Sequence, residues 1–173
     1  MKFISYIMNA IKGRFFMDAI IRKFDMEDME ELHKMIEHTI EESYKWVYSE
    51  QVRQVLKNQH VDEQIIDRAE NEYVLVAIDP EDEDRIIGTG SLIKCRIFGV
   101  YVKSEYQGNG IGIRLMEELE DKAIGNGIKK LILSASISSK DFYEKLGYKG
   151  KPKIIKLDNG KEYIVYDMEK ELQ

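Results

Sequence analysis

The sequence is poor in cysteine and proline, and it has no long apolar run. A single cysteine, Cys95, excludes an internal disulfide, so the chain gains its stability from a packed core; this suits a reducing setting, and we expect a cytoplasmic location. The three histidines lie in the N-terminal helical region, and none is poised to activate the thiol. We therefore expect Cys95 to be a packed strand residue rather than a nucleophile.

The chain is also short of positive charge. Its 26 lysines and arginines stand against 32 aspartates and glutamates, which gives a formal net charge of −6. This balance argues against nucleic-acid binding as the main function. His33 and His38 lack a supporting cysteine or carboxylate-histidine cluster, so we expect no metal site. The length of 173 residues suits one domain with its own core.

Residues 1–16 differ from the rest of the chain. Apolar residues from Phe3 to Phe15 make one helical face, but the run is too short and too interrupted to span a membrane. Three interpretations stay open: an amphipathic helix that docks on the domain or on a partner, a membrane-surface helix, or a non-native extension. We favour docking or an extension, which places an N-terminal amphipathic extension at 1–16 and the domain at 17–173.

Periodicity predicts strands and helices in alternation over the remaining chain. Helices are expected in the segments that begin at Asp25, Ser49 and Asp62, and over residues 136–146. Strands are expected at 19–24, 73–78, 85–93, 97–102, 129–135, 153–157 and 162–168. A strand, a helix and a second strand around residue 110 form a crossover, so those two strands should be parallel.

The crossover contains a glycine-rich junction, Gln107-Gly108-Asn109-Gly110-Ile111-Gly112. The first N–H groups of a helix have no partner within it, and the helix dipole makes that end positive. Glycines let the chain turn sharply and leave room for a ligand, so this junction predicts an anion site, usually for a phosphate. The P-loop and dinucleotide patterns both fail, because Ile113 stands where each needs glycine. What remains is Q-x-x-G-x-G.

A second motif, Phe142-Tyr143-Glu144-Lys145-Leu146-Gly147-Tyr148, lies nearer the C-terminus. Together the two motifs resemble the GNAT superfamily of acyl-CoA-dependent N-acyltransferases. Its pyrophosphate loop is Q/R-x-x-G-x-G/A, and a later helix often ends F/L-Y-E-K-L-G-F/Y. The resemblance covers about residues 18–168. It implies an α/β fold in a single domain, with a mixed, mostly antiparallel sheet, helices on both faces and a splayed parallel strand pair.

The resemblance also implies a site for acetyl-CoA (coenzyme A). Backbone groups from Val100 to Val102 would bind its pantetheine arm, and the N–H groups from Gly108 to Ile113 would hold its pyrophosphate. Ser136 and Ser139 stand where many members have Asn and Ala, which puts the contact usually made by that Asn in doubt. The cofactor-binding residues implied in this way are Val100, Tyr101, Val102, Gln107, Gly108, Asn109, Gly110, Ile111, Gly112, Ile113, Ser136 and Ser139.

Five residues are candidates for chemistry and acceptor binding. Tyr143 is predicted as the general acid, because a phenol stays protonated at neutral pH and can protonate the leaving CoA thiolate; alternatively it only packs beneath the cofactor. Glu105 is a candidate base through a water, or an ordinary loop carboxylate. Tyr44 and Trp46, with Tyr48 beside them, are candidates for the wall of an amine pocket, or aromatic anchors of the helical layer.

Two functional hypotheses result. In the first, the protein is an N-acetyltransferase that moves an acetyl group from acetyl-CoA to a primary amine of a small molecule or peptide, by direct attack in a ternary complex. In the second, it is a noncatalytic module that senses acyl-CoA or binds a partner. The resemblance also allows a homodimer. Release of free CoA that depends on an added amine separates the two hypotheses.

Overall fold

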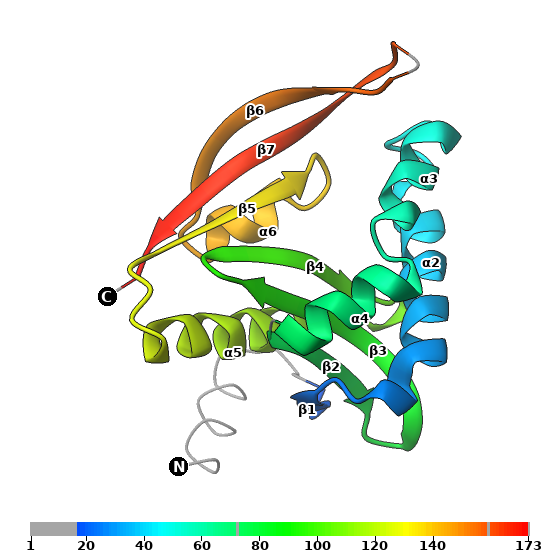
Figure 1. The fold of residues 1–173 in the computed structure, drawn as a ribbon, viewed down its shortest axis with the longest axis vertical. Helices are drawn as coiled ribbons and strands as arrows, with labels where there is room; N and C mark the ends of the chain where they lie inside the picture. The colour runs from blue at the N-terminus through cyan, green and yellow to red at the C-terminus, as the bar shows by residue number, and fades with distance from the viewer. Residues whose placement is uncertain (1–16, 72, 159, 173) are drawn as a thin grey trace.

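The computed structural model describes residues 17–71, 73–158 and 160–172, so the predicted N-terminal extension lies outside the described residues. Figure 1 shows the chain as a ribbon. Two short 3-10 helices, η1 (Met26–Asp28) and η2 (Ser104–Tyr106), accompany the main elements. In chain order these are β1 (Ile20–Lys23), α2 (Met29–Tyr44), α3 (Glu50–Asn58), α4 (Asp62–Asn71), β2 (Tyr73–Asp79), β3 (Asp82–Ile93), β4 (Arg96–Val102), α5 (Ile111–Gly125), β5 (Lys130–Ser136), α6 (Lys140–Lys145), β6 (Lys149–Lys156) and β7 (Glu162–Glu171).

The strands form one mixed sheet in the order β1-β2-β3-β4-β5-β7-β6. Neighbouring strands are antiparallel except for β4 and β5, which run parallel and are joined through α5. The predicted crossover and the predicted fold class, a single α/β domain with a mostly antiparallel sheet, are confirmed.

Each face of the sheet carries its own apolar core. On one face, α5 buries Leu115, Met116 and Leu119 against strand residues such as Leu131 and Leu133. On the other face, α2 and α4 bury a second cluster against β2 and β3: Leu32, Met35, Ile36, Ile40, Ile65, Val76, Ile78 and Ile86. These two faces follow from the spacing of apolar residues three and four apart on the helices and two apart on the strands.

The starts of the helical segments η1–α2 and α3 follow local capping rules. Asp25 accepts a hydrogen bond from the Glu27 N–H, and the Asp28 side chain accepts one from the Asp25 N–H, which completes a capping box before α2. Ser49 accepts from the Val52 N–H at the start of α3. Both starts are where the sequence predicts them, because caps depend on near neighbours.

The parallel pair β4–β5 is splayed. The two strands share one register position, Arg96 with Ile132, and the Ile132 N–H donates to the Cys95 carbonyl at 2.9 Å. β5 goes on to pair with β7 through Ser136, and β4 goes on to pair with β3 through Val102. The facing edges of β4 and β5 therefore separate toward their C-terminal ends, and Figure 1 shows this opening in the middle of the sheet.

Two local predictions were wrong. Cys95 is exposed rather than packed, because it lies in the tight turn between β3 and β4. Ile93, the last residue of β3, pairs with Arg96, the first residue of β4. The helix predicted over 136–146 begins only at Lys140, because Ser136 is paired in the sheet as the last residue of β5. In the first case the chain turns where its pattern favours a strand, and in the second strand pairing extends over a residue whose pattern favours a helix.

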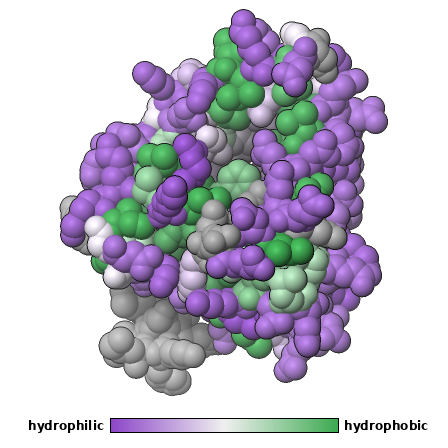
Figure 2. Space-filling model, in the orientation of Figure 1, coloured by the Kyte–Doolittle hydropathy of each residue, from purple (hydrophilic) through white to green (hydrophobic). Residues whose placement is uncertain are grey.

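The surface on the side seen in Figure 2 is largely hydrophilic, and its apolar side chains lie in small separate groups. Within the ranges that the structure describes, no helix is long and apolar enough to cross a membrane.

A pair of substitutions on α5 tests the assignment of its buried face. We expect Leu115→Ala to lower the free energy of unfolding by about 2–5 kcal/mol, because Leu115 is fully buried and the smaller side chain leaves a cavity. Ile124→Ala, on the exposed side of the same helix, should cost about 0.5 kcal/mol or less. Urea unfolding measures both, and equal losses would contradict the assignment.

Candidate active site

The glycine-rich junction forms a tight loop between β4 and α5. Gly108 and Gly110 both have φ of +81°, a conformation that favours glycine, and Gly110 is the N-cap residue of α5 without a side-chain cap. The Gln107 amide donates to the Val102 carbonyl at 2.9 Å, and the Asn109 amide donates to the Tyr106 carbonyl at 3.2 Å. These side-chain hydrogen bonds hold the loop while its glycines leave its outer surface bare.

The N–H groups of this loop are available to a ligand. Among the described residues, no hydrogen bond is donated by the backbone N–H groups from Gly108 to Ile113. A Cβ atom placed on Gly108 would meet no other atom within 4 Å, so the space beside the loop is open. Such a row of donors at the positive end of a helix fits the pyrophosphate of a coenzyme A molecule in charge and in hydrogen-bonding character.

The neighbouring strand β4 carries an irregularity next to the splayed edge. Gly90 of β3 lies opposite two residues of β4, Gly99 and Val100, which makes a β-bulge. Gly99 has φ of +61°. The bulge turns the backbone of β4 locally, on the strand whose other edge no longer pairs with β5.

Tyr143 lies on α6, below the opening between β4 and β5. Its side chain is buried, and its ring makes edge contacts with Phe142 at 5.0 Å and Tyr148 at 5.9 Å between centroids. Within the described part of the chain, no hydrogen-bond partner is found for its hydroxyl. Burial, together with the neighbouring Tyr44, raises the pKa of Tyr143 well above its ordinary value, so its phenol stays protonated at neutral pH.

α6 is held directly against the start of α5. A Cβ atom on Gly112 would lie 3.3 Å from Cζ of Phe142 and 3.8 Å from Cγ2 of Val102. Gly112 therefore permits the close approach of α6, the glycine loop and the end of β4. One opening is therefore bordered by Tyr143, by the free N–H groups of the loop and by the unpaired edge of β4.

Comparison with known proteins identifies this arrangement. The sequence matches the family described as Acetyltransferase (GNAT) domain over residues 22–172, most of the chain. The protein belongs to the GNAT family. As a member of this family it is an acyltransferase, and acetyl-CoA is its acyl donor.

Individual relatives agree with this family. The chain is 32% identical to glucosamine 6-phosphate N-acetyltransferase 1 of Dictyostelium discoideum over 124 residues, which cover 60% of this chain and 77% of that protein. A GCN5-related N-acetyltransferase from Rhodopseudomonas palustris has a similar fold, with a TM-score of 0.79 at 24% identity, over 89% of this chain and 96% of that one. A PaiA N-acetyltransferase from Thermoplasma acidophilum in complex with coenzyme A has a TM-score of 0.72 at 23% identity, over 90% of this chain and 99% of that one.

The two serines that replace the common GNAT residues form their own turn. Ser136 Oγ and Ser139 Oγ lie 2.7 Å apart, and the Ser139 N–H donates to Ser136 Oγ at 3.2 Å. The turn joins β5 to α6, so both serines border the opening. Their hydroxyls are engaged with one another, and contact of either with acetyl-CoA stays a prediction.

The aromatic candidates for the acceptor pocket separate in the structure. Tyr44 packs edge-on against Tyr48 at 5.5 Å, whereas Trp46 is 89% exposed and has Lys45 over its ring at 5.8 Å. Burial raises the pKa of Tyr44, and a hydrogen bond with Ser136 partly offsets that rise. Tyr44 therefore reaches the end of β5, and Trp46 points to solvent.

Tyr48, which the sequence groups with Tyr44 and Trp46, joins the loop after α2 to the half of the sheet that holds β5 and β7. Its hydroxyl donates to the Ile164 carbonyl of β7 at 2.9 Å and accepts from the Ile137 N–H at 3.3 Å. Its ring also contacts Tyr163 at 5.6 Å. Burial raises the pKa of Tyr48 to about 12. This tyrosine connects the end of α2 to β7 across the opening, a contact that no local sequence signal indicates.

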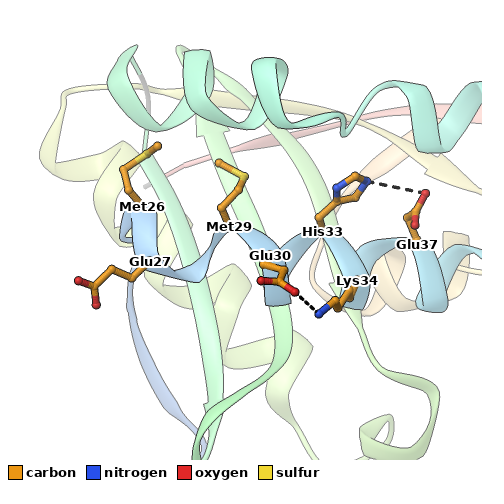
Figure 3. A pocket seen from close by; sticks show the side chains of 7 residues that line it. All are labelled: Met26, Glu27, Met29, Glu30, His33, Lys34 and Glu37. Carbon is orange, nitrogen blue, oxygen red and sulfur yellow. Dashed lines mark hydrogen bonds and ion pairs between the residues drawn. The ribbon is translucent and has the colours of Figure 1, made fainter.

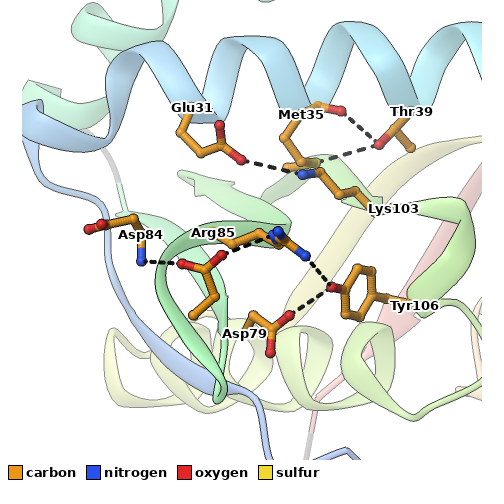
Figure 4. A network of polar contacts seen from close by, with 9 residues as sticks. Glu31, Met35, Thr39, Asp79, Asp84, Arg85, Lys103 and Tyr106 are labelled. Atoms are coloured by element: carbon orange, nitrogen blue, oxygen red, sulfur yellow. Dashed lines mark hydrogen bonds and ion pairs between the residues drawn. The ribbon is translucent and has the colours of Figure 1, made fainter.

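Glu105 lies on η2 and is exposed. The loop around it is fixed by the polar contacts drawn in Figure 4: the Tyr106 hydroxyl donates to Asp79 at 2.7 Å, and the Arg85 guanidinium donates to that hydroxyl at 3.4 Å. The hydrogen bond from Tyr106 holds the pKa of Asp79 below its usual value. Lys103 binds Glu31 of α2 at 3.3 Å and so ties the same loop to the helical layer.

A separate hollow lies on the outer side of α2 (Figure 3). Along it Lys34 forms an ion pair with Glu30, and Nε2 of His33 lies 3.7 Å from a carboxylate oxygen of Glu37. None of its lining residues belongs to the glycine loop, β4, β5 or α6. In the described ranges, no group of three or more His, Cys, Asp or Glu side chains is arranged to hold a metal ion.

Two glycines on α5 test the assignment of the loop. We expect Gly112→Ala to weaken acetyl-CoA binding about tenfold, because the added methyl group presses on Phe142 and separates α6 from the loop. Gly125→Ala, at the far end of α5, meets no atom within 4 Å and should leave the affinity unchanged. Calorimetric titration with acetyl-CoA measures both, with ATP as the ligand control. An unchanged affinity in Gly112→Ala would contradict the assignment.

Proposed function

We propose that the protein transfers an acetyl group from acetyl-CoA to a primary amine by direct attack in a ternary complex. The observation that carries this proposal is the row of free N–H groups from Gly108 to Ile113, which opens on the same gap as the unpaired edge of β4 and the buried Tyr143. Direct attack needs both substrates in one opening, and a gap bordered by α5, α6 and the end of α2 provides that proximity.

In this proposal, the backbone of β4 from Val100 to Val102 binds the pantetheine arm as an additional strand would. Its edge toward β5 is not paired there, so its N–H and C=O groups can take a new partner. The N–H groups of the glycine loop bind the pyrophosphate. Ser136 and Ser139 flank the same opening on the β5 side.

Tyr143 is the proposed general acid. Acetyl-CoA supplies a thioester whose sulfur leaves as a thiolate, and a protonated phenol can donate to it. Because burial raises the pKa of Tyr143, the proton stays available at pH values where a free phenol would begin to ionise. The general-acid contribution to the rate should therefore persist through about pH 10 and be lost only above the raised pKa.

The acceptor is proposed to be a small molecule with a primary amine. The Dictyostelium relative is named for glucosamine 6-phosphate, which makes this amino sugar the first acceptor to test. Tyr44 and Tyr48 wall the opening on the α2 side and would contact the acceptor there. The exposed Cys95 and the absence of any second cysteine suit a reducing compartment, so a cytoplasmic location is part of the proposal.

Two measurements in sequence test the function. Titration with acetyl-CoA and free CoA should show binding of both, with no binding of ATP. A thiol-detecting assay should then show CoA release that depends on an added amine, glucosamine 6-phosphate first and a panel of small amines and peptides after it. Tight binding without amine-dependent release would support the acyl-CoA-sensing alternative instead.

We expect Tyr143→Phe to lower turnover about 100-fold while acetyl-CoA affinity stays within about twofold, because only the proton donor is removed. Tyr148→Phe is the matched control: its ring contacts Tyr143, but its hydroxyl donates to Glu120 at 3.0 Å. That control should lose about 1–3 kcal/mol of stability with turnover close to wild type. Unchanged turnover in Tyr143→Phe would rule out the general-acid role.

A further inference from the structure

The end of α2 and the loop after it, residues 43–48, contact both sides of the splayed sheet; we call this segment the strap. At one end, Oγ of Ser43 lies 3.4 Å from Nε2 of Gln107, which belongs to the loop between β4 and α5. At the other end, the Tyr48 hydroxyl donates to the Ile164 carbonyl of β7. The strap therefore joins the β4 side of the opening to the β7 side.

The two ends of the strap are held with different strength. Tyr48 is buried, and its hydroxyl lies 2.9 Å from the carbonyl oxygen that it bonds. Ser43 makes two side-chain contacts, with Gln107 and with Oγ of Ser104, and both are 3.4 Å long and exposed. Long hydrogen bonds that compete with water are weak. The strap is thus firmly anchored to β7 and loosely held at the glycine loop.

Gln107, which holds the loose end, also contacts the open edge of β4. Val102 lies opposite Gly88 of β3, and the Lys103 N–H donates to the Ile87 carbonyl at 2.9 Å. Backbone polar groups alternate between the two edges of a strand, so those of Val102 point away from β3, toward the side where β4 and β5 separate. Nε2 of Gln107 donates to that Val102 carbonyl at 2.9 Å.

One primary amide therefore touches the strap and the edge of β4 at the same time. Its NH₂ group has two donors, one for the Val102 carbonyl and one for Ser43, and the carbonyl oxygen keeps a second lone pair for a ligand. A ligand arm that pairs along this edge restrains the backbone of Val102. It restrains with it the amide of Gln107, and through that amide the hydroxyl of Ser43.

We propose that Gln107 ties the strap to the glycine loop when acetyl-CoA binds, and so prepares the acceptor side of the opening for the amine. This inference rests on the proposed acetyl transfer, in which Tyr44 and Tyr48 of the strap wall the acceptor side. A strap that is ordered before the amine arrives removes part of the entropic cost of binding the amine. Gln107 is a positioning residue, because it acts through Ser43 and not on the amine.

Hydrogen exchange of the strap, followed by NMR, tests this tie. The Val47 and Tyr48 N–H groups donate to the Tyr44 carbonyl at 3.0 and 2.9 Å, so their exchange reports how often the turn in the strap opens. In the wild type, we expect saturating CoA to slow their exchange about fivefold, the lower end of typical coupling between two sites.

Two substitutions remove the tie in different ways. Ser43→Ala removes the contact with the strap and keeps the hydrogen bond from Gln107 to Val102. Gln107→Met keeps the length of the side chain and removes both donors. In each variant, we expect CoA to slow the exchange of the strap less than about twofold. Gln54→Met on α3 is the matched control: its exposed amide donates to Asn58 at 2.9 Å, and the control should keep the wild-type slowing.

Steady-state kinetics supply a second readout. Because the tie acts on the acceptor side and leaves Tyr143 in place, Ser43→Ala should raise the KM for the amine about fivefold and keep kcat within about twofold of wild type. The amine is the one that the wild type acetylates fastest, with glucosamine 6-phosphate as the first probe. An unchanged KM would contradict the proposed effect on the acceptor side.

The outcomes separate the tie from the transferase. Equal slowing of exchange in the wild type, Ser43→Ala and Gln107→Met overturns the tie and leaves the transferase intact. A wild type that binds CoA without slower exchange in the strap does the same. If the wild type binds no CoA, the proposed function and the tie both fail. If Gln107→Met does not fold, Ser43→Ala decides the question, because alanine suits the last turn of a helix.

Discussion

The rest of the site depends on how little β4 and β5 pair with each other. A parallel pair that continued beyond Arg96 and Ile132 would satisfy the edge of β4 and close the gap. Because pairing stops there, backbone donors and acceptors of β4 face an opening instead of a strand. The free N–H groups at the start of α5 border the same opening, so one interrupted ladder creates a long polar surface suited to an extended ligand such as acetyl-CoA.

Aromatic contacts lie on both sides of the gap. On one side, Phe142 is seated against Gly112, and Tyr143 and Tyr148 continue the stack below it. The Tyr148 hydroxyl donates to Glu120, which also binds Lys170 at 2.6 Å, so a partly buried ion pair anchors the stack. On the other side, Tyr48 spans from α2 to β7. Different tyrosines therefore anchor α6 on one side of the gap and the loop after α2 on the other.

The hydroxyls of Tyr143 and Tyr101 lie in different environments. Burial and the neighbouring Tyr44 raise the pKa of Tyr143 and keep its phenol protonated, whereas the Tyr101 hydroxyl lies against the imidazole of His60. In the proposed function, the phenol of Tyr143 on α6 is the proton donor to the leaving thiolate.

Local rules were sufficient for much of this protein. The sequence alone determined the strand, glycine loop and helix around Gly110, the cap at Ser49 and the motif that carries Tyr143, because turns, caps and apolar periodicity depend on residues within a few positions of one another. Only the tertiary structure decided that His60 meets Tyr101, that Tyr48 joins α2 to β7, and that Trp46 and Cys95 face solvent. Those outcomes depend on strand register and on helix packing between residues tens of positions apart, and no local pattern records such distances.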